Sequence, residues 1–286
     1  MALMQAPSGG AVGEPFSLRP LWPSPEGGRG ETHAKKRGKN GLEFAAKLAR
    51  GADKALSLIA VLMILLLLCY GGYSLWDTAM LYKGAFNSSD LLQYKPSADD
   101  PESLTFEELL KLNPDVCAWI TVDDTHIDYP VVQGEDDMEY INKDVKGEFA
   151  LSGAIFLSCL NKRDFSDSYN LLYGHHMDGG AMFGDVVEFR DKSYFDSHET
   201  GTLYLPGKAI PITFFACVSI DAFDSVIYHP DAQPAGDVTT LLNHIQGTAV
   251  QYRDIGVTAK DQIIGLSTCS EAVTNGRVVL FGRLDK

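Results

Sequence analysis

The longest uncharged run in the chain lies close to its N-terminus. Residues 55–76 contain no charged side chain, and about 20 apolar residues are enough to cross the hydrocarbon core of a membrane. Basic residues precede the run and Asp77 follows it, which favours a cytoplasmic N-terminus and a domain outside the cell. A cleaved signal peptide is the alternative, although no small-residue cleavage pattern follows. The pattern predicts a transmembrane helix in a single-pass protein of the cell membrane.

The segments on either side of this helix lack the pattern of a packed domain. Residues 1–54 are predicted to be a disordered, basic, cytoplasmic terminus, because residues 1–30 are rich in Gly and Pro and the Lys and Arg residues follow them. A nucleic-acid patch is the rival interpretation of the basic run, but its place directly before an apolar segment favours a role in membrane topology. Residues 77–103 are polar with scattered apolar positions, which predicts a helical stalk or linker.

From residue 104 onward, short apolar runs alternate with turn residues. Thr105-Phe-Glu-Glu108 reads as a capping box that opens a short helix through Leu112, and Asn113-Pro114 stops it. Further helices are predicted at 182–190 and at 237–253, the second with Asp237 as its N-cap. Strands are predicted at 118–122, 127–132, 154–158, 169–174, 202–205, 210–220, 262–269 and 277–284. The pattern indicates a mostly β domain with peripheral helices, α+β in class, built as a sandwich or a barrel.

The last two predicted strands place reactive side chains at adjacent ends. The first closes on Cys269, the turn signal Asn275-Gly276 follows, and the second opens on Arg277. A cationic neighbour favours thiolate over thiol and can bind a developing oxyanion. Taken alone, Cys269 could be an inert core residue and Arg277 a structural ion-pair partner, for instance of Glu271.

A proton-transfer residue is available at the end of an earlier strand. Residues 169–174 form an apolar run that ends at Gly174 and is followed by His175 and His176. Histidine is the usual general acid or base near neutral pH. The residues alone do not choose between the two histidines.

Several of these motifs resemble those of the class B sortases of Gram-positive bacteria. The likeness covers roughly residues 104–286 and includes Leu266-Ser-Thr-Cys269, Tyr173-Gly-His175, Arg277, Trp119-Ile-Thr-Val122, Ile127-Asp-Tyr-Pro-Val-Val132, Gly153-Ala-Ile-Phe156 and Met182-Phe183. The resemblance implies a sortase-type barrel of eight strands with peripheral helices, including a helical insertion before the Cys strand. It implies catalysis by Cys269, by His175, which directly follows the Gly, and by Arg277. It further implies substrate contacts at Ser267, Thr268, Ile141, Asp137 and Tyr140.

The same resemblance implies a cysteine transpeptidase. Such an enzyme cleaves a C-terminal sorting signal after Thr through a thioacyl intermediate and transfers the surface protein to a cell-wall amine. The implied partners are the sorting-signal peptide, a cell-wall precursor amine and the lipid bilayer, and the chemistry requires no cofactor or metal. Three alternatives stay open: a pilin polymerase with a pilin lysine as acceptor, a cysteine protease, and a non-catalytic, membrane-tethered peptide-binding domain.

Charge and cysteine content argue against a nucleic-acid partner, a zinc site and a disulfide framework. The net charge is −14, but residues 1–54 carry nine Lys/Arg against five Asp/Glu, and the remainder carries fifteen against thirty-three. An acidic main domain repels phosphate, so nucleic acid is not an expected partner. The five cysteines show no metal-binding spacing, so neither a zinc site nor a disulfide framework is expected.

Overall fold

The computed structural model describes residues 32–85, 89–97, 104–269 and 275–285. Within these ranges, only the backbone is described for residues 32–40, 81–85, 89–90, 104–105 and 269. The predicted disorder of residues 1–30, part of the predicted stalk and Glu271 lie outside the described residues. The chain divides into two compact units, residues 1–69 and residues 70–286.

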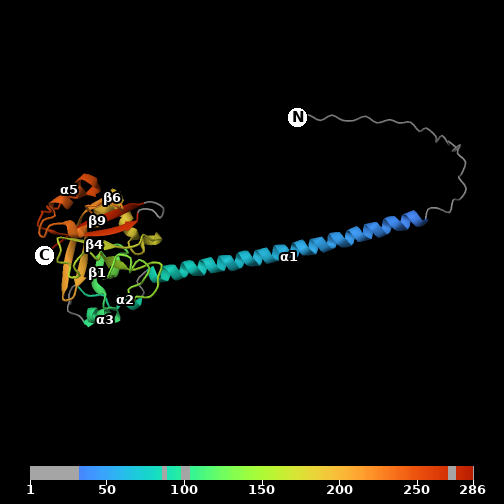
Figure 1. Cartoon of the computed structure of the whole chain (residues 1–286), viewed down its shortest axis with the longest axis horizontal. Coiled ribbons are helices and arrows are strands. Elements are labelled where there is room, and N and C mark those ends of the chain that lie inside the picture. Colours follow the sequence, from blue (N-terminus) through green and yellow to red (C-terminus); the bar gives the residue numbers. More distant parts are fainter. Residues whose placement is uncertain (1–31, 86–88, 98–103, 270–274, 286) are drawn as a thin grey trace, which may run out of the picture. The chain divides into compact units, whose positions relative to one another are not determined.

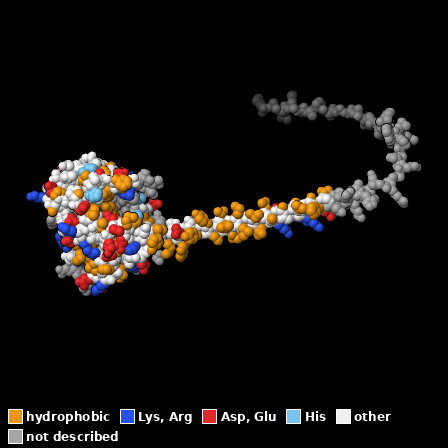
Figure 2. Space-filling view, viewed as in Figure 1, with side chains coloured by type: hydrophobic (Ala, Val, Ile, Leu, Met, Phe, Trp, Pro, Cys, Tyr) orange, Lys and Arg blue, Asp and Glu red, His pale blue; other side chains and the backbone are white. Residues whose placement is uncertain are grey.

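The first unit contains most of a single long helix. Helix α1 spans Thr32–Ala85, and its stretch Gly41–Met80 is long and apolar enough to cross a membrane. The apolar side chains of this stretch are exposed, as the space-filling view in Figure 2 shows. The predicted disorder of residues 32–54 is therefore wrong, since these residues are helical. Residues 41–54 are rich in Ala, Leu, Lys and Glu, and extending an existing helix is far easier than nucleating one.

The predicted stalk is only partly helical beyond α1. Helix α2 is a single turn, Ser89–Leu92, and this turn and the residues after it already pack on the following domain. Leu91 and Tyr94 contact a buried apolar cluster, and the Lys95 ammonium lies 2.7 Å from the Asp128 carboxylate. Helix α3, Leu104–Leu112, begins one residue before the predicted capping Thr105.

The eight predicted strands are all present, with small shifts at their ends. They are β1 (Val116–Val122), β2 (Asp128–Val132), β3 (Ile155–Leu157), β4 (Tyr169–Tyr173), β5 (Thr200–Leu205), β6 (Lys208–Asp221), β8 (Gln262–Cys269) and β9 (Gly276–Leu284). A further short strand, β7 (Ala249–Tyr252), pairs with β6.

These strands form a closed barrel. The sheet order is β5-β1-β2-β3-β4-β8-β9-β6-β7, and an additional pairing between β5 and β6 closes the ring. Eight strands therefore make the barrel, and β7 lies outside the ring as an edge strand. Most neighbours are antiparallel, but β2 runs parallel to β3 and β4 runs parallel to β8. The predicted eight-stranded barrel with peripheral helices is confirmed.

The peripheral helices differ from their predictions in extent. The segment predicted as helix 182–190 is a 3-10 helix, η2 (Gly184–Arg190), followed by α4 (Lys192–Ser197). Helix α5 covers Thr239–Thr248, so the predicted helical residues 249–253 are wrong and belong mostly to β7. Short 3-10 turns lie at Asp178–Gly180 (η1) and Pro230–Ala232 (η3). The N-cap of α5 is Val238 and not the predicted Asp237, although the Asp237 carboxylate accepts a hydrogen bond from the Thr239 N–H, 2.9 Å away.

The core has an interior and two covered outer faces. Apolar side chains from alternating strand positions fill the barrel. On one outer face, Leu241 and Ile245 of α5 pack against Phe215 and Phe281. On another, α3 packs on Trp119 and its neighbours. Figure 1 shows α5 and α3 on different sides of the barrel.

Candidate active site

Backbone pairing brings the three predicted catalytic residues to one end of the barrel. Cys269, the last residue of β8, faces Arg277 in the antiparallel pair with β9. On the other side of β8, Ser267 faces Tyr173 in the parallel pair with β4. His175 follows Tyr173 by two residues, as Cys269 follows Ser267, so the two residues leave neighbouring strands side by side. The Gly174 N–H donates to the Ser267 carbonyl, 3.1 Å away, which continues the pairing toward His175.

The His175 ring is oriented by a backbone carbonyl from another loop. Its Nε2 lies 2.8 Å from the Ile141 carbonyl oxygen. A carbonyl only accepts hydrogen bonds, so the proton of a neutral His175 sits on Nε2, and Nδ1 is the nitrogen with a lone pair. Ile141, predicted to contact substrate, therefore acts through its backbone on the ring of His175.

Gly153 leaves the space that this contact requires. It has φ +61°, and a Cβ added to it would lie 2.5 Å from the Ile141 oxygen, 2.8 Å from the Tyr140 oxygen and 3.1 Å from Cδ2 of His175. A side chain at this position would displace the carbonyl that orients the histidine. The signal for this residue in the sequence is only a Gly at the start of a strand motif.

Arg277 has a half-buried side chain at the start of β9. Its Nη1 donates to the carbonyl of its own neighbour Gly276 at 3.0 Å. Within the described part of the chain, no carboxylate pairs with this guanidinium. The remaining N–H groups of Arg277 are therefore suited to bind a carbonyl oxygen or an oxyanion.

An aromatic wall that sequence reasoning missed lies beside Ser267. The Tyr228 ring, from the segment between β6 and α5, stacks on Tyr173 with centroids 6.3 Å apart and planes at 12°. The Tyr228 hydroxyl lies 3.1 Å from Ser267 Oγ, and Phe156 packs on the other side of Tyr173 at 5.2 Å. The contacting residues are far apart in sequence, so no motif signals this wall.

The segment that carries Tyr228 is held by a side-chain pair. Asp224 Oδ1 accepts the N–H groups of Val226 at 3.0 Å and Ile227 at 2.9 Å. Its other oxygen, Oδ2, lies 2.9 Å from Nε2 of His244 on α5. Helix α5 thereby anchors the segment that presents Tyr228 to the strand leading to Cys269.

The other predicted substrate residues occupy structural positions. Thr268 is 2% exposed, and its hydroxyl donates to the Gly174 carbonyl at 2.9 Å, which ties β8 to the turn before His175. Tyr140 is 3% exposed, and its hydroxyl donates to Asp115 at 2.7 Å. Asp137 accepts the Cys159 N–H at 2.6 Å, and its charge contributes to a raised pKa of the Tyr173 hydroxyl, for which burial is the larger cause.

Three described thiols outside helix α1 have environments that disfavour a thiolate. Burial raises the pKa of Cys117 and of Cys217 to about 12. Burial, together with the Asp137 carboxylate, also raises the pKa of Cys159. At these three cysteines no cation lowers the pKa enough to offset the increase. Cys269 differs because strand pairing sets it opposite Arg277.

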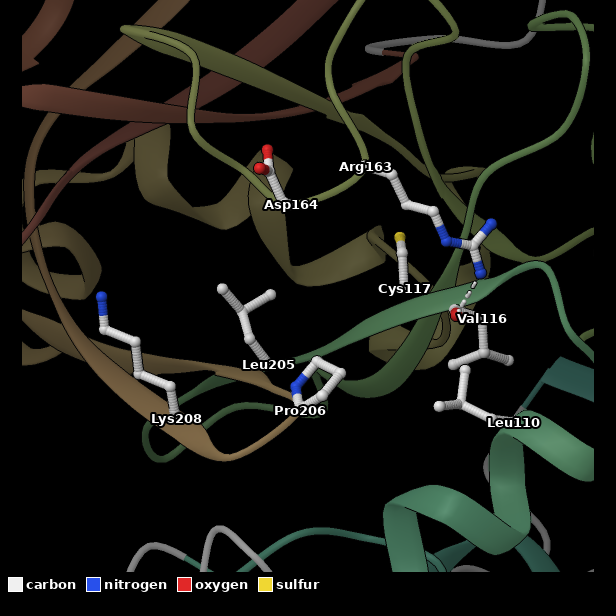
Figure 3. A pocket seen from close by; sticks show the side chains of 8 residues that line it. All are labelled: Leu110, Val116, Cys117, Arg163, Asp164, Leu205, Pro206 and Lys208. Carbon is white, nitrogen blue, oxygen red and sulfur yellow. Dashed lines mark hydrogen bonds between the residues drawn. The ribbon is translucent and has the colours of Figure 1, made fainter.

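A cavity among the described residues lies at the other end of the barrel from Cys269. It has a volume of about 500 Å³ and is lined by Leu110, Val116, Cys117, Arg163, Asp164, Leu205, Pro206 and Lys208 (Figure 3). Lys208 begins β6, whereas Cys269 ends β8, and the pairing of β6 with β9 and of β9 with β8 sets these two residues at opposite ends. The Arg163 guanidinium donates to the Val116 carbonyl at 2.6 Å. Within the described residues, no three His, Cys, Asp or Glu side chains gather to hold a metal ion.

Comparisons with known proteins give one consistent family. No family model matches the chain. The chain is 32% identical over 179 residues to the sortase B of Listeria monocytogenes, a match that covers 62% of this chain and 72% of that relative. It is 26% identical over 238 residues to the sortase B of Staphylococcus aureus, covering 81% of this chain and 97% of the relative.

Solved structures agree with the sequence relatives. A class B sortase of Streptococcus pyogenes involved in pilus biogenesis superposes with TM-score 0.58 at 44% identity, over 63% of this chain and 97% of that one. A Staphylococcus aureus sortase B–substrate complex gives TM-score 0.59 at 29% identity, over 64% and 85%. Sortase B from the type II pilus of Streptococcus pneumoniae gives TM-score 0.54 at 39% identity, over 63% and 98%. With the barrel and the converging strand ends, these matches show that the chain belongs to the class B sortases and is a cysteine transpeptidase.

Proposed function

We propose that Cys269 is the nucleophile that attacks the carbonyl carbon after a Thr in a C-terminal sorting signal. The new S–C bond replaces the scissile C–N bond, and the downstream peptide leaves as an amine. A second amine then attacks the thioester, forms a new amide and returns the sulfur to Cys269. The observation that carries this proposal is the pairing of Cys269 with Arg277 beside the strand that leads to His175.

The geometry supports separate roles for the two partners. His175 Nδ1, the nitrogen opposite the Ile141 contact, accepts the proton of the Cys269 thiol and passes it to the leaving amine; it later accepts the proton of the incoming amine and returns it to the departing sulfur. Arg277 binds the substrate carbonyl and the oxyanion that develops from it. Ser267 and the stacked Tyr173 and Tyr228 line the approach of the peptide to Cys269.

The long apolar helix supports a membrane-anchored enzyme. We place the crossing at residues 55–76, the basic N-terminal part in the cytoplasm, and the catalytic domain, residues 104–286, outside the cell. Residues 77–103 connect the two.

Two amines are candidates for the acceptor. The first is the amine of a cell-wall precursor, which joins the surface protein to the wall. The second is a lysine of a pilin, in which case the enzyme is a pilin polymerase. The identities favour the pilin lysine. They are 44% and 39% to sortases from pilus systems, and 32% and 26% to the sortase B proteins of Listeria and Staphylococcus.

Peptide cleavage with and without an added amine tests the mechanism. We expect a mass-shifted acyl enzyme in the wild type and none in Cys269→Ala. We expect His175→Ala and Arg277→Ala to lose about 100-fold or more in turnover, the usual contribution of an acid–base group or an oxyanion donor. Wild-type activity in the Cys269 variant would refute the mechanism. Water as the sole acceptor would show a protease, and a product ligated to a pilin lysine but not to a wall-precursor amine would identify the polymerase.

A further inference from the structure

Helix α1 is longer than a membrane crossing requires. Its stretch Gly41–Met80, which contains the candidate membrane crossing, has 40 residues, which at about 1.5 Å per residue is about 60 Å, roughly twice the thickness of the hydrocarbon core. The uncharged residues 55–76 are sufficient for the crossing. The 14 residues before them, Gly41–Lys54, are helical but lie outside the core, where they meet lipid headgroups and water.

This segment has two chemically different faces. Lys47, Arg50 and Lys54 are spaced by three and four residues, so they share one helical face. Phe44 and Leu48 are 67% and 60% exposed and are four residues apart, so they lie on one side of the helix. At about 100° per residue, Leu48 points away from the three cations, whereas Phe44 lies beside the basic face, next to Lys47. Figure 2 shows cationic side chains along one edge of this end of the helix and hydrophobic side chains along the other.

The charge balance of this region favours an anionic surface. Residues 32–54 contain seven Lys or Arg against two acidic residues, Glu43 and Asp53. Basic residues on the polar face and apolar residues opposite are typical of helices that lie in the membrane interface. Cations close to an anionic leaflet are each attracted to its headgroups.

A glycine marks the junction between the two parts of the helix. Gly51 lies inside α1, and a Cβ added to it would meet nothing within 4 Å. Packing therefore does not require a glycine here, although glycine weakens a helix relative to alanine. It provides a position at which the helix can bend between the crossing and the membrane surface.

We propose that Gly41–Lys54 is an interfacial segment that binds anionic phospholipid headgroups. Lys47, Arg50 and Lys54 contact the phosphates, and Phe44 and Leu48 enter the boundary between headgroups and acyl chains. The basic residues thus have a binding role in addition to setting topology. This inference rests on the membrane crossing of α1 and is independent of the catalytic residues.

Hydrogen–deuterium exchange of the full chain in lipid nanodiscs tests the proposal, because both surfaces of a nanodisc are accessible and topology plays no part. The probes are nanodiscs of phosphatidylcholine alone and nanodiscs that also contain phosphatidylglycerol. We expect the amides of residues 41–54 to exchange about tenfold more slowly with phosphatidylglycerol. The variant K47Q/R50Q/K54Q should lose this difference, and K47R/K54R should keep it.

A matched control neutralises three lysines of the barrel. The variant K192Q/K208Q/K260Q has the same change in net charge and should keep the lipid-dependent protection. Peptide cleavage by K47Q/R50Q/K54Q should equal that of the wild type, which shows that the catalytic domain is folded. Equal exchange of residues 41–54 in both lipid compositions would overturn the proposal, as would unchanged protection in K47Q/R50Q/K54Q.

Discussion

Replacing Gly153 with alanine tests how His175, the proposed catalytic histidine, is oriented. The new Cβ would lie 2.5 Å from the Ile141 oxygen, whereas ordinary contact begins near 3.4 Å. The carbonyl must therefore retreat by about 0.9 Å, the difference between these two distances. The same oxygen lies 2.8 Å from Nε2 of His175, so the bond that fixes the ring is weakened or lost.

Two energetic effects are expected in Gly153→Ala. Left-handed backbone costs a non-glycine residue about 1–2 kcal/mol, and overpacking adds about 1–3 kcal/mol. In a domain of this size each kcal/mol lowers Tm by about 2–4 °C. A misplacement near 1 Å can reduce turnover by about 100-fold. We therefore expect a large fall in kcat with a smaller change in KM.

Gly147→Ala is the matched control. Gly147 lies in the same loop with φ +80°, and a Cβ added to it would meet nothing within 4 Å. It shares the backbone strain but lacks the clash with the Ile141 carbonyl. Thermal unfolding by circular dichroism and cleavage of a fluorogenic peptide, measured below both Tm values, compare the two variants. Equal kcat in Gly147→Ala and Gly153→Ala would refute the argument that this carbonyl orients His175.

Three further changes probe the rest of the domain. Tyr228→Phe removes the contact of the hydroxyl with Ser267 Oγ at 3.1 Å but keeps the ring stack. A loss of about 1 kcal/mol in the free energy of peptide binding should raise KM about fivefold and preserve kcat. An unchanged KM in steady-state kinetics would place Tyr228 outside the peptide path. Thr268→Val removes the buried hydrogen bond to the Gly174 carbonyl at 2.9 Å. It should lower kcat, and it should lower the free energy of unfolding in urea by about 1–3 kcal/mol. Thr268→Ser should restore both quantities, and its failure to do so would contradict the hydrogen-bond explanation. Asp191 caps α4, and hydrogen bonds from Ser193 and Tyr194 lower its pKa. The stability that its carboxylate contributes is therefore complete above the unfolded pKa of about 3.9 and is lost as the pH falls through the lower folded pKa. The Tm difference between wild type and Asp191→Ala should shrink in this acidic window, and a constant difference would argue against a role for the charge.

Much of the fold could be predicted because local pattern and tertiary structure agree. The apolar run of β8, Gln262–Cys269, has the bounds predicted from the sequence, since both of its faces are covered and turn residues follow it. The barrel type came from the family resemblance, because short strands with turns are equally compatible with a sandwich. β7 was missed because Ala249–Tyr252 follows α5 without a break, and only its pairing with β6 makes it a strand.

The site was harder to predict than the strands that carry it. The three catalytic candidates lie at strand ends, so turn signals pointed to Cys269 and Arg277, and the family resemblance selected His175 over His176. The orientation of His175 depends on a carbonyl 34 residues away, and the wall at Tyr228 depends on a hydroxyl contact across 39 residues. Such contacts depend on three-dimensional packing, which neither the hydrophobic period of a segment nor the spacing of motifs along the chain encodes. For the same reason Thr268 and Tyr140 could not be recognised as buried structural residues.

The position of β9 between β8 and β6 has a consequence for the order of assembly. A chain emerging from its N-terminus has made seven of the ring's eight strands before it reaches Gly276, yet β6 and β8 still lack the neighbour they share. Ring closure and the juxtaposition of sulfur with guanidinium are then the same event. A nascent or prematurely terminated chain thus has its cysteine without its arginine partner, and the proposed thioester chemistry requires that synthesis has passed the hairpin between β8 and β9.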